Sequence, residues 1–382
     1  MKSVVIAGYA RSPFCFATKG ELAKVRADDL AAMVVRALVE RTKVNPNEIE
    51  DLILGCAFPE GEQGLNVARL IGFLAKLPLS VAGVTMNRFC GSSMQAIHTA
   101  AGAIQMDAGE VFICAGVESM SRVPMSGFNP MPNPELAAAY PQAYMSMGTT
   151  AENVAKKYKL TRKDQEAFAV QSQTKAAAAQ AAGKFKDEIV PFTTASGIVE
   201  QDGCIRAGTT AAKLAELKPA FDDKGSVTAG TSSPLTDGAS AVLVASEDFA
   251  RAHNLPILAR IKSIAVVGCA PEIMGIGPVA ATQKALNRAG LTIEDIDIIE
   301  LNEAFASQAL ACMWDLGISP DGGKVNLDGG AIALGHPLGA TGARIVGKAA
   351  SLLKREGGKF ALATQCIGGG QGIATILEAV EK

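Results

Sequence analysis

Two parts of this 382-residue chain follow the same order of helix and strand signals. Residues 34–58 and 281–305 each predict a helix with an Ala-Leu pair, a turn, an acidic helical turn and a short apolar strand ending in Ala-Phe. An offset of 247 residues separates Phe58 from Phe305, and it is constant over the preceding residues. A fixed offset is the mark of an internal repeat, in which each copy is one structural unit.

A second pair of segments follows in the same order. Gly91 and Gly339 open predicted helices at an offset of 248, and each helix leads through a Gly turn into an apolar strand, at 111–116 and 359–364. The alternative is chance similarity between two ordinary βαβ units. Two separate segments with nearly one offset favour duplication instead.

The repeat also predicts the fold class. Apolar strands that alternate with helices of about 10 to 15 residues indicate βαβ units, with mostly parallel strands buried on both faces. One core seldom grows beyond about 300 residues, so the length favours two packed units. We therefore predict a duplicated α/β fold, with one half at residues 1–118, completed by 235–255, and the other at 256–382.

The segment between the halves, residues 119–234, has a different character. It begins with a loop rich in Pro, Met and Asn and continues through helical runs at 151–158 and 162–182. Insertions of this kind map to loops on the functional face of a fold. We predict a loop domain that covers the end of the first half and holds substrate.

Charge and cysteine spacing exclude several classes of protein. With 36 Lys and Arg against 38 Asp and Glu, the chain has no basic surface for nucleic acid or anionic membrane. Its longest charge-free stretches, 89–106 and 360–377, contain polar residues and glycines, so no membrane span is expected. The eight cysteines form no C-x-x-C motif, and with three histidines they predict neither a metal site nor a disulfide framework. The apolar start of the chain is expected to be a first strand of a cytoplasmic protein, not a secretory signal.

Two candidate catalytic residues lie in equivalent turns of the repeat. Cys90 directly precedes a predicted helix, whose N-terminus would lower the thiol pKa from about 8.5 and favour the nucleophilic thiolate. His336 lies in the matching turn of the second half, 335–339, and suits the base that a Cys nucleophile needs. The alternatives are a buried structural Cys and a satisfied core His.

Two further candidates follow predicted strands of the second half. Cys366 precedes four glycines within five residues, 368–372, which favour an oxyanion-binding turn or a tight hairpin. A phosphate-binding loop is disfavoured because no Walker or dinucleotide-binding motif is present. Asn302 ends the predicted strand 298–301, where it could otherwise serve only as a helix cap.

In this order, the motifs NRFCGSSMQAI, NEAFA, NLDGGAIALGHPLGATGAR and QCIGGGQGIA resemble the thiolase family over essentially the whole chain. The resemblance implies two layered α/β halves with an inserted loop domain. It also implies an acyltransferase that cleaves 3-ketoacyl-CoA with CoA, giving acetyl-CoA and a shortened acyl-CoA through an acyl-Cys intermediate.

The family pattern also implies a role for each matched residue. Cys90 would be the acylated nucleophile, His336 its base, and Cys366 the acid and base that moves the α-proton. Asn302 would hold a water that, with His336, stabilises the enolate oxygen. The backbone N–H groups of Cys90 and Gly368 would form a second oxyanion hole.

Substrate contacts carry over more loosely. Ser233 corresponds to a pantetheine contact, and Arg206 could reach a phosphate of CoA. Three residues match positions that line the acyl pocket, with core packing as the alternative: Met147, Met274 and Phe305. No cofactor is implied, since CoA and acyl-CoA are substrates.

Departures from the family pattern bear on substrate choice. Ser146 stands where short-chain thiolases have His, which favours the degradative branch over a biosynthetic acetoacetyl-CoA thiolase. Asp328 stands where many members have Asn. Family members are usually dimers or dimers of dimers, so the resemblance implies a homodimer or homotetramer, and some degradative members join a multienzyme β-oxidation complex.

Two other functions compete with this interpretation. A decarboxylating ketoacyl synthase shares the fold and a nucleophilic Cys but pairs it with two His, or with His and Asn, so Cys366 argues against it. A non-catalytic acyl-CoA-binding homologue should have lost at least one of Cys90, His336 and Cys366, and all three are present.

Overall fold

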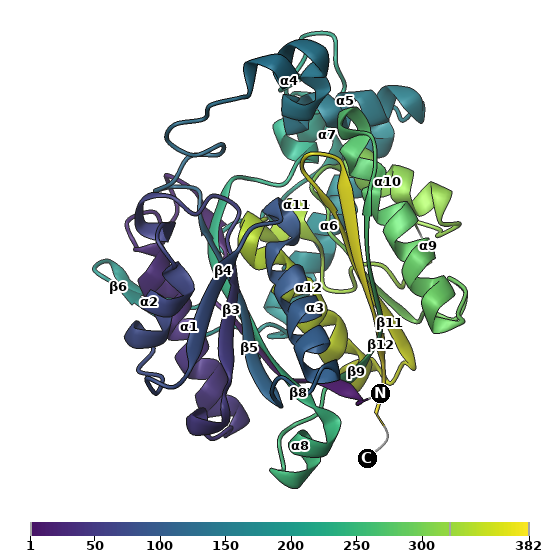
Figure 1. Ribbon diagram of the computed structural model, residues 1–382. Helices are drawn as coiled ribbons and strands as arrows, with labels where there is room; N and C mark the ends of the chain where they lie inside the picture. Colours follow the sequence, from purple (N-terminus) through teal and green to yellow (C-terminus); the bar gives the residue numbers. More distant parts are fainter. Residues whose placement is uncertain (1, 321, 381–382) are drawn as a thin grey trace.

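The computed structural model describes residues 2–320 and 322–380, and Figure 1 labels its helices and strands. The first half contains β1 (Val4–Arg11), β2 (Cys15–Phe16), α1 (Ala27–Thr42), η1 (Pro46–Glu48), β3 (Asp51–Gly55), η2 (Gly61–Gln63), α2 (Val67–Leu74), β4 (Ala82–Met86), η3 (Phe89–Gly91), α3 (Ser92–Gln105) and β5 (Val111–Ser119). The inserted segment contains α4 (Pro134–Ala139), η4 (Pro141–Tyr144), α5 (Met147–Lys157), α6 (Arg162–Ala181), β6 (Phe192–Thr194), β7 (Gly197–Val199), α7 (Ala211–Ala215) and η5 (Ala229–Thr231). The remainder contains β8 (Thr236–Ser246), α8 (Glu247–Ala252), β9 (Ala259–Gly268), η6 (Pro271–Ile276), α9 (Gly277–Ala289), β10 (Ile298–Leu301), α10 (Ala306–Asp315), α11 (Ala331–Leu334), α12 (Leu338–Glu356), β11 (Phe360–Ile367) and β12 (Gln371–Glu378).

The duplication is visible in the order of the strands. Within the described residues, one sheet runs β10-β11-β12-β9-β1-β8-β5-β3-β4, and β2 pairs with β8. Read outward from the centre, β1-β8-β5-β3 on one side matches β9-β12-β11-β10 on the other. Among the described strands, the two sides of the sheet are joined by the pairing of Val5 with Arg260 and of Ile6 with Ala259. The predicted α/β class with duplicated halves is confirmed.

The prediction of mostly parallel strands is wrong. Strands β3, β4 and β5 are parallel to one another, as are β10 and β11, but the pairs at the centre of the sheet are antiparallel. Strand β8 lies antiparallel between β5 and β1, and β12 lies antiparallel between β11 and β9. The last strand of each half thus runs antiparallel to its neighbours. The spacing of apolar residues in the sequence does not distinguish an antiparallel buried strand from a parallel one.

A second correction concerns the turn that precedes β10. The first copy of the repeat has the predicted helical turn, η1, which begins at Pro46 with Asn45 as its cap. In the second copy the Asp295 carboxylate accepts from the Thr292 N–H at 2.8 Å, and residues 293–296 form an irregular turn. A proline at the first helical position favours the helical turn, and the second copy lacks one.

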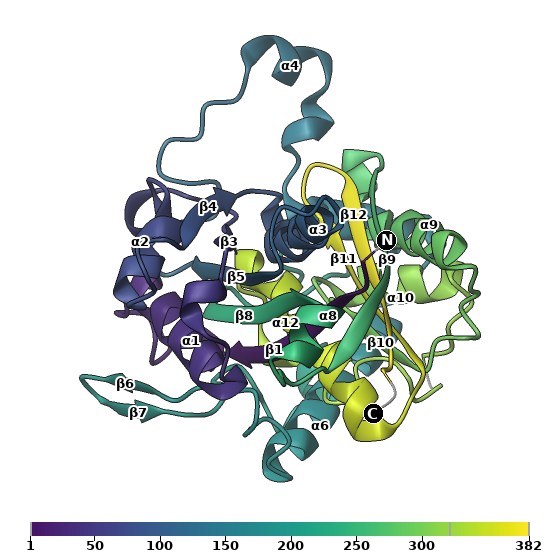
Figure 2. The same cartoon turned by 60° about the horizontal axis from the view of Figure 1, so that its bottom comes forward.

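Helices α3 and α12 lie side by side in the middle of the molecule (Figures 1 and 2). They bury one apolar core between the two sides of the sheet, while α1 and α2 cover one outer face and α9 and α10 the other. The central helices approach so closely that a Cβ at Gly342 would lie 2.2 Å from the Met94 backbone nitrogen. Their N-terminal ends therefore meet, which sets the place of the candidate site.

The inserted segment contacts both halves. Its helices α5 and α6 pack against α10 and α11 of the second half, where Ser307 donates to the Ala151 carbonyl at 3.0 Å. Its residue Ile189 forms a bridge with Arg11 at the end of β1. The sequence predicted that this segment covers the end of the first half. These contacts show that it also packs against the second half. The domain boundaries proposed above stay a prediction. No helix in the described part of the chain is long and apolar enough to cross a membrane.

Candidate active site

Cys90 lies in a sharp turn between β4 and α3. The preceding residue, Phe89, has a φ of 41°, which is strained for a residue with a Cβ. Two hydrogen bonds hold this turn: the Phe89 N–H donates to Asn87 at 2.7 Å, and the Ser92 hydroxyl donates to the Phe89 carbonyl at 2.6 Å. The side chain of Gln365 in β11 donates to the Cys90 carbonyl. The thiol is thus fixed from both halves of the chain.

The prediction that the helix N-terminus lowers the thiol pKa is wrong for the free protein. Burial raises the pKa of Cys90 to about 11, although hydrogen bonds from the Gly368 N–H and from its own N–H act to lower it. The desolvation penalty for a thiolate exceeds the gain from these donors. Cys90 is a thiol at neutral pH and needs a base to become a nucleophile.

His336 turns the lone pair of its Nε2 toward the site, where the Asn302 Nδ2 approaches it at 3.4 Å. Its Nδ1 lies 2.6 Å from the Thr341 hydroxyl, which donates its only hydrogen to the Pro337 carbonyl at 3.1 Å. The hydroxyl must therefore accept from His336, so Nδ1 carries the proton and Nε2 is the acceptor. Burial, and then the Arg344 charge, lower the His336 pKa to about 3. The imidazole is neutral at physiological pH.

Asn302 extends β10 by one residue toward His336. Its N–H donates to the Thr364 carbonyl of β11 at 3.0 Å, and its side-chain Nδ2 lies 3.4 Å from His336 Nε2. Both side chains are buried, and Asn302 Oδ1 has no hydrogen-bond partner. A buried amide with an unpartnered oxygen is suited to hold a water or a polar group of a ligand. The structure thus joins these two candidates in one contact.

Cys366 lies near the end of β11, paired in register with Gly372 of β12. The turn between these strands is a tight hairpin in which Gly369 and Gly370 have φ values of 78° and 83°. A Cβ at Gly370 would lie 2.3 Å from the Cys269 carbonyl oxygen. The hairpin predicted from these glycines is confirmed. Burial, and then the charge of Cys90, raise the pKa of Cys366 well above its usual value.

Packing brings the two equivalent turns and the hairpin together. Cys90 shares a buried cluster with Leu338, two residues after His336. Beside it, a Cβ at Gly91 would lie 2.5 Å from the Ile367 side chain at the end of β11. Two thiols, a neutral imidazole, an amide and an oxyanion-type N–H pair therefore lie on adjoining turns at this junction. Such a set can perform nucleophilic acyl transfer with separate proton transfers.

The buried carboxylate of Glu118, which was not among the predicted site residues, accepts hydrogen bonds from both halves beside these turns. Glu118, at the end of β5, accepts from the backbone N–H groups of Ala57 at 2.8 Å and Phe58 at 3.2 Å, and from Gln63 at 2.9 Å. It also accepts from the Gly339 N–H at the start of α12, at 2.9 Å. The only signal in the sequence is a charged residue near the end of an apolar strand.

The three predicted acyl-pocket residues lie together beside Cys366. Met274, Phe305 and Cys366 share one buried cluster, and Met147 packs against it. The sulfur of Met147 also lies 3.4 Å from the position of a Cβ at Gly368. These side chains form an apolar wall next to the thiols.

The two predicted CoA contacts lie in different places. Ser233 is next to the apolar wall, because its N–H donates to the Ala304 carbonyl at 2.9 Å. Arg206 is exposed, and its guanidinium lies over the Phe16 ring, 4.9 Å from the centroid. The structure therefore groups Ser233 with Phe305, and Arg206 with β2.

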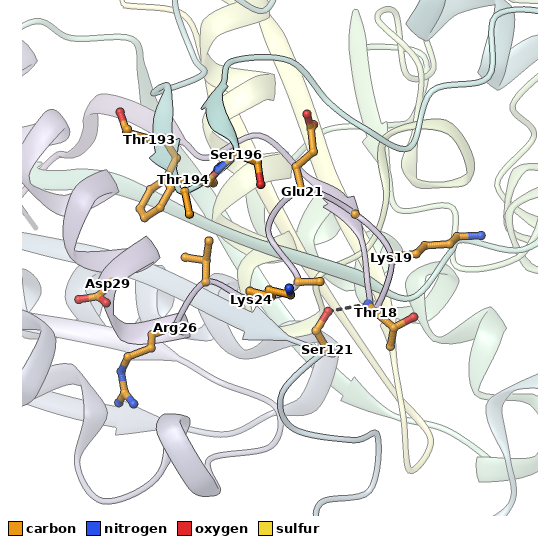
Figure 3. Close-up of a pocket in the computed structure, with 15 residues that line it drawn as sticks. Thr18, Lys19, Glu21, Lys24, Arg26, Asp29, Ser121, Thr193, Thr194 and Ser196 are labelled. Atoms are coloured by element: carbon orange, nitrogen blue, oxygen red, sulfur yellow. Dashed lines mark hydrogen bonds between the residues drawn. The ribbon is translucent and has the colours of Figure 1, made fainter.

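None of these candidates lines the open cleft in Figure 3, which has a volume of about 710 Å³. That cleft lies between residues 18–29 and the β6–β7 hairpin, and its labelled side chains carry charges of both signs. In the described residues, no three His, Cys, Asp or Glu side chains are grouped as metal ligands. That the protein uses no cofactor, with CoA and acyl-CoA acting as substrates, stays a prediction.

The chain matches two family models in succession. Residues 4–248 match the thiolase N-terminal domain, and residues 255–379 match the thiolase C-terminal domain. Together these models cover almost all of the chain.

Named proteins and solved structures agree with these matches. The chain is 50% identical to a 3-ketoacyl-CoA thiolase of Bacillus subtilis, covering 99% of this chain and all of that protein. It is 49% identical to a 3-ketoacyl-CoA thiolase of Marinobacter nauticus, with 99% of each chain covered. Human mitochondrial 3-ketoacyl-CoA thiolase, solved in complex with CoA, superposes with a TM-score of 0.92 and 39% identity, covering 99% of this chain and 98% of that one.

Proposed function

Because this chain belongs to the thiolase family, we propose that Cys90 is the nucleophile of its reaction and that His336 is the base. The protein is an acyltransferase that cleaves 3-ketoacyl-CoA by thiolysis, the degradative direction. The observation that supports the residue roles best is the meeting of the Cys90 and His336 turns at the N-terminal ends of α3 and α12.

The first half-reaction forms an acyl-enzyme. His336 Nε2 takes the proton of Cys90, and the thiolate attacks C3 of the 3-ketoacyl-CoA. The new S–C3 bond forms, the C2–C3 bond breaks, and its electron pair becomes the enolate of acetyl-CoA. Cys366 gives its proton to C2 and is left as a thiolate. Acetyl-CoA then leaves.

The second half-reaction returns both thiols to their starting state. The Cys366 thiolate takes the proton of an incoming CoA thiol, whose sulfur attacks the acyl carbon on Cys90. The Cys90–acyl bond breaks, and His336 returns its proton to Cys90. The products are a shortened acyl-CoA and the free enzyme, in a ping-pong cycle.

Two sets of donors would stabilise the charge that develops on oxygen. Asn302, through a water on its free oxygen, and His336 would face the enolate oxygen. The N–H groups of Cys90 and Gly368 would face the oxygen on the carbon that Cys90 attacks, and both already point at the Cys90 sulfur. Preorganised donors of this kind are worth about 3 to 4 kcal/mol each.

Substrate binding follows from the same surroundings. We propose that the acyl chain lies along Met147, Met274 and Phe305, and that pantetheine passes Ser233 on its way out. Arg206 offers an exposed cation for a phosphate of CoA. The degradative thiolase, and not the biosynthetic acetoacetyl-CoA enzyme, is favoured by the named relatives and by Ser146 at the place of the short-chain His.

Mass spectrometry tests the central assignment. Intact protein mixed with acetoacetyl-CoA and no free CoA should gain one acetyl group, and peptide mapping should place it on Cys90. An adduct on another residue, or none, contradicts the proposal. Cys90→Ala is the matched control and should gain no acetyl group.

We also infer that the protein is a homodimer joined at the β4 edge of the sheet. Among the described strands, β4 pairs with β3 on one side and with no strand on its other edge, where the Asn66 side chain donates to the Gly83 carbonyl at 2.7 Å. Around it, large apolar side chains are exposed, Leu65 by 89%, Leu79 by 78% and Phe73 by 47%. Unprotected apolar edge strands pair with other chains, and a second copy offers a matching edge. Light scattering of the wild-type protein should give twice the mass of one chain. Val84→Pro in β4 should shift the measured mass toward that of the monomer. A wild-type mass of four chains would indicate a tetramer.

Two expectations about the cell remain proposals. We place the protein in the cytoplasm, which fractionation of cells tests. Association with another enzyme of β-oxidation is tested by co-purification from those cells at low salt. CoA thioesters are its small-molecule partners.

A further inference from the structure

A second contact lies directly behind the Asn302–His336 contact. Residues two apart on a strand point to the same side, so Glu300 and Asn302 both project from β10 toward α12. Glu300 accepts a hydrogen bond from Arg344 of α12 at 2.8 Å, just as Asn302 contacts His336 at 3.4 Å. Strand and helix ends are thus joined by two successive side-chain contacts.

The helix side of these contacts is equally regular. Thr341 holds His336, Arg344 follows three residues later, and Lys348 follows after four more, so all three lie on one face of α12. Lys348 pairs with Glu188 at 2.9 Å instead of with β10. Of these three residues, Arg344 is therefore the one that bonds directly to β10, through Glu300.

Burial makes this ion pair costly to maintain, and it raises the pKa of Glu300 to about 7 although the Arg344 charge acts to lower it. The side chains of Glu300 and Arg344 are exposed by only 1% and 2%. One carboxylate oxygen and two guanidinium nitrogens have no partner among the described residues, namely Glu300 Oε1, Arg344 Nε and Arg344 Nη2. A buried pair with unpartnered atoms contributes little stability, and apolar residues of similar volume often serve as well. A role in stability alone does not account for it.

We propose that Glu300 and Arg344 form a positioning pair, which holds α12 against β10 so that the His336 imidazole and the Asn302 amide face the same substrate oxygen. The inference rests on the proposed function and adds to it two residues that touch no substrate. Displacement of about 1 Å at reacting groups can cost up to a hundredfold in rate, so the spacing of these elements is decisive.

The pair also acts on His336 through charge. The positive charge of Arg344 helps to keep the imidazole neutral, after the larger effect of burial. The charged groups around the pair are Lys348 on α12, Asp328 before α11 and Glu188 in the inserted segment. Removing the Arg344 charge should raise the pKa of His336, which a purely structural role would not do.

The test compares three variants of the full-length protein in thiolysis of acetoacetyl-CoA. Arg344→Met removes the charge and the donors, Glu300→Gln removes the carboxylate charge, and Arg344→Lys keeps the positive charge. Arg344→Met and Glu300→Gln should lower kcat by about tenfold or more with KM changed by less than about threefold, because the positioned groups act mainly in the transition state. Arg344→Lys should recover part of kcat.

The pH profile and a matched control separate positioning from folding. The acid limb of kcat/KM should move to higher pH in Arg344→Met and stay in place in Arg344→Lys. Arg11→Met removes a buried cation of β1 that pairs with Asp202 at 2.6 Å, and it should lower stability without changing kcat per folded molecule. If Arg344→Met and Glu300→Gln fold, as judged by circular dichroism, and keep wild-type kcat and acid limb, the proposal is wrong. If Arg344→Met does not fold, Glu300→Gln and Arg344→Lys decide by the same criteria.

Failure of the positioning pair can be told apart from failure of the proposed catalytic roles. That failure would appear in the wild-type protein, as absence of an acetyl group on Cys90. A wild-type protein that is acetylated on Cys90, with active Arg344→Met, would contradict the positioning pair alone.

Discussion

The carboxylate of Glu118 and the backbone N–H of Gly339 form a hydrogen bond of 2.9 Å across the junction of the two halves. Gly339 is the second residue of α12 and lies three residues after His336, and the other donors to Glu118 come from the first half, beside the Cys90 turn. One buried carboxylate therefore ties the nucleophile side of the active site to the base side.

Replacing this carboxylate should separate the two turns. In Glu118→Gln, an amide group would face backbone donors with one acceptor in place of two. We expect a loss of about 2 to 4 kcal/mol in the free energy of unfolding and a fall in kcat of about tenfold or more. Urea unfolding and thiolysis assays measure both. Glu247→Gln, in α8, is the control that should lower stability alone, since it removes a partly buried ion pair far from the site. Wild-type kcat in folded Glu118→Gln would contradict the link between the halves.

Alkylation should report the raised pKa of Cys90. With a pKa of about 11, its thiolate fraction rises about tenfold per pH unit from pH 7 to pH 10. The rate of iodoacetamide labelling at Cys90, followed by peptide mass spectrometry, should rise in proportion over this range. A rate that is already constant near pH 7 would mean that the free enzyme holds a thiolate.

Removing the second thiol should separate the two half-reactions. In Cys366→Ala, no group remains to protonate the enolate or to deprotonate CoA, so thiolysis should fall by about a thousandfold or more. Cys90 and its base are unchanged, and a CoA thiolate leaves without a proton donor far more readily than an enolate, so acetylation of Cys90 by acetyl-CoA should continue at a reduced rate. Intact-mass kinetics measure that step, and equal loss of both activities would contradict separate roles for the two cysteines.

His98 should make stability depend on pH in a defined window. It is buried in α3 against Thr375, and burial lowers its pKa to about 3. Below pH 6.5 the unfolded chain binds a proton at His98 that the folded chain does not, so stability contributed above pH 6.5 is lost as the pH falls toward 3. The wild type should lose about 1.4 kcal/mol per pH unit relative to His98→Gln below pH 6.5. Urea unfolding from pH 7.5 to pH 5 gives both curves, and parallel curves would show that His98 is protonated in the folded protein.

Local patterns in the sequence predicted a large part of the fold. Apolar runs and glycine turns gave the positions of β5, β10, β11, α3 and α12, because burial and backbone freedom are encoded within a few residues. The equivalent turns that carry Cys90 and His336 followed from the offset between the copies. The direction of β8 and β12 did not, because a strand buried on both faces has the same composition in either orientation.

The electrostatics of the site depend on contacts that no local pattern contains. The helix N-terminus at Cys90 was predicted, but its effect on the thiol pKa is outweighed by burial under residues of the other half. Glu118 meets a donor 221 residues away, and Glu300 meets Arg344 across 44 residues. Glu118 and Glu300 are charged residues within apolar strand sequences, so a buried partner could have been expected for each. The sequence does not identify those partners.

The side-by-side packing of α3 and α12, with their N-terminal ends together, has an evolutionary consequence. If each half were a separate chain and the two associated as a symmetric pair, any substitution at the turn would occur in both copies, giving two cysteines or two imidazoles. Fusion into one polypeptide lets the two turns mutate independently. A division of labour between a nucleophile on one side and a proton acceptor on the other is open to the fused gene and closed to its symmetric ancestor.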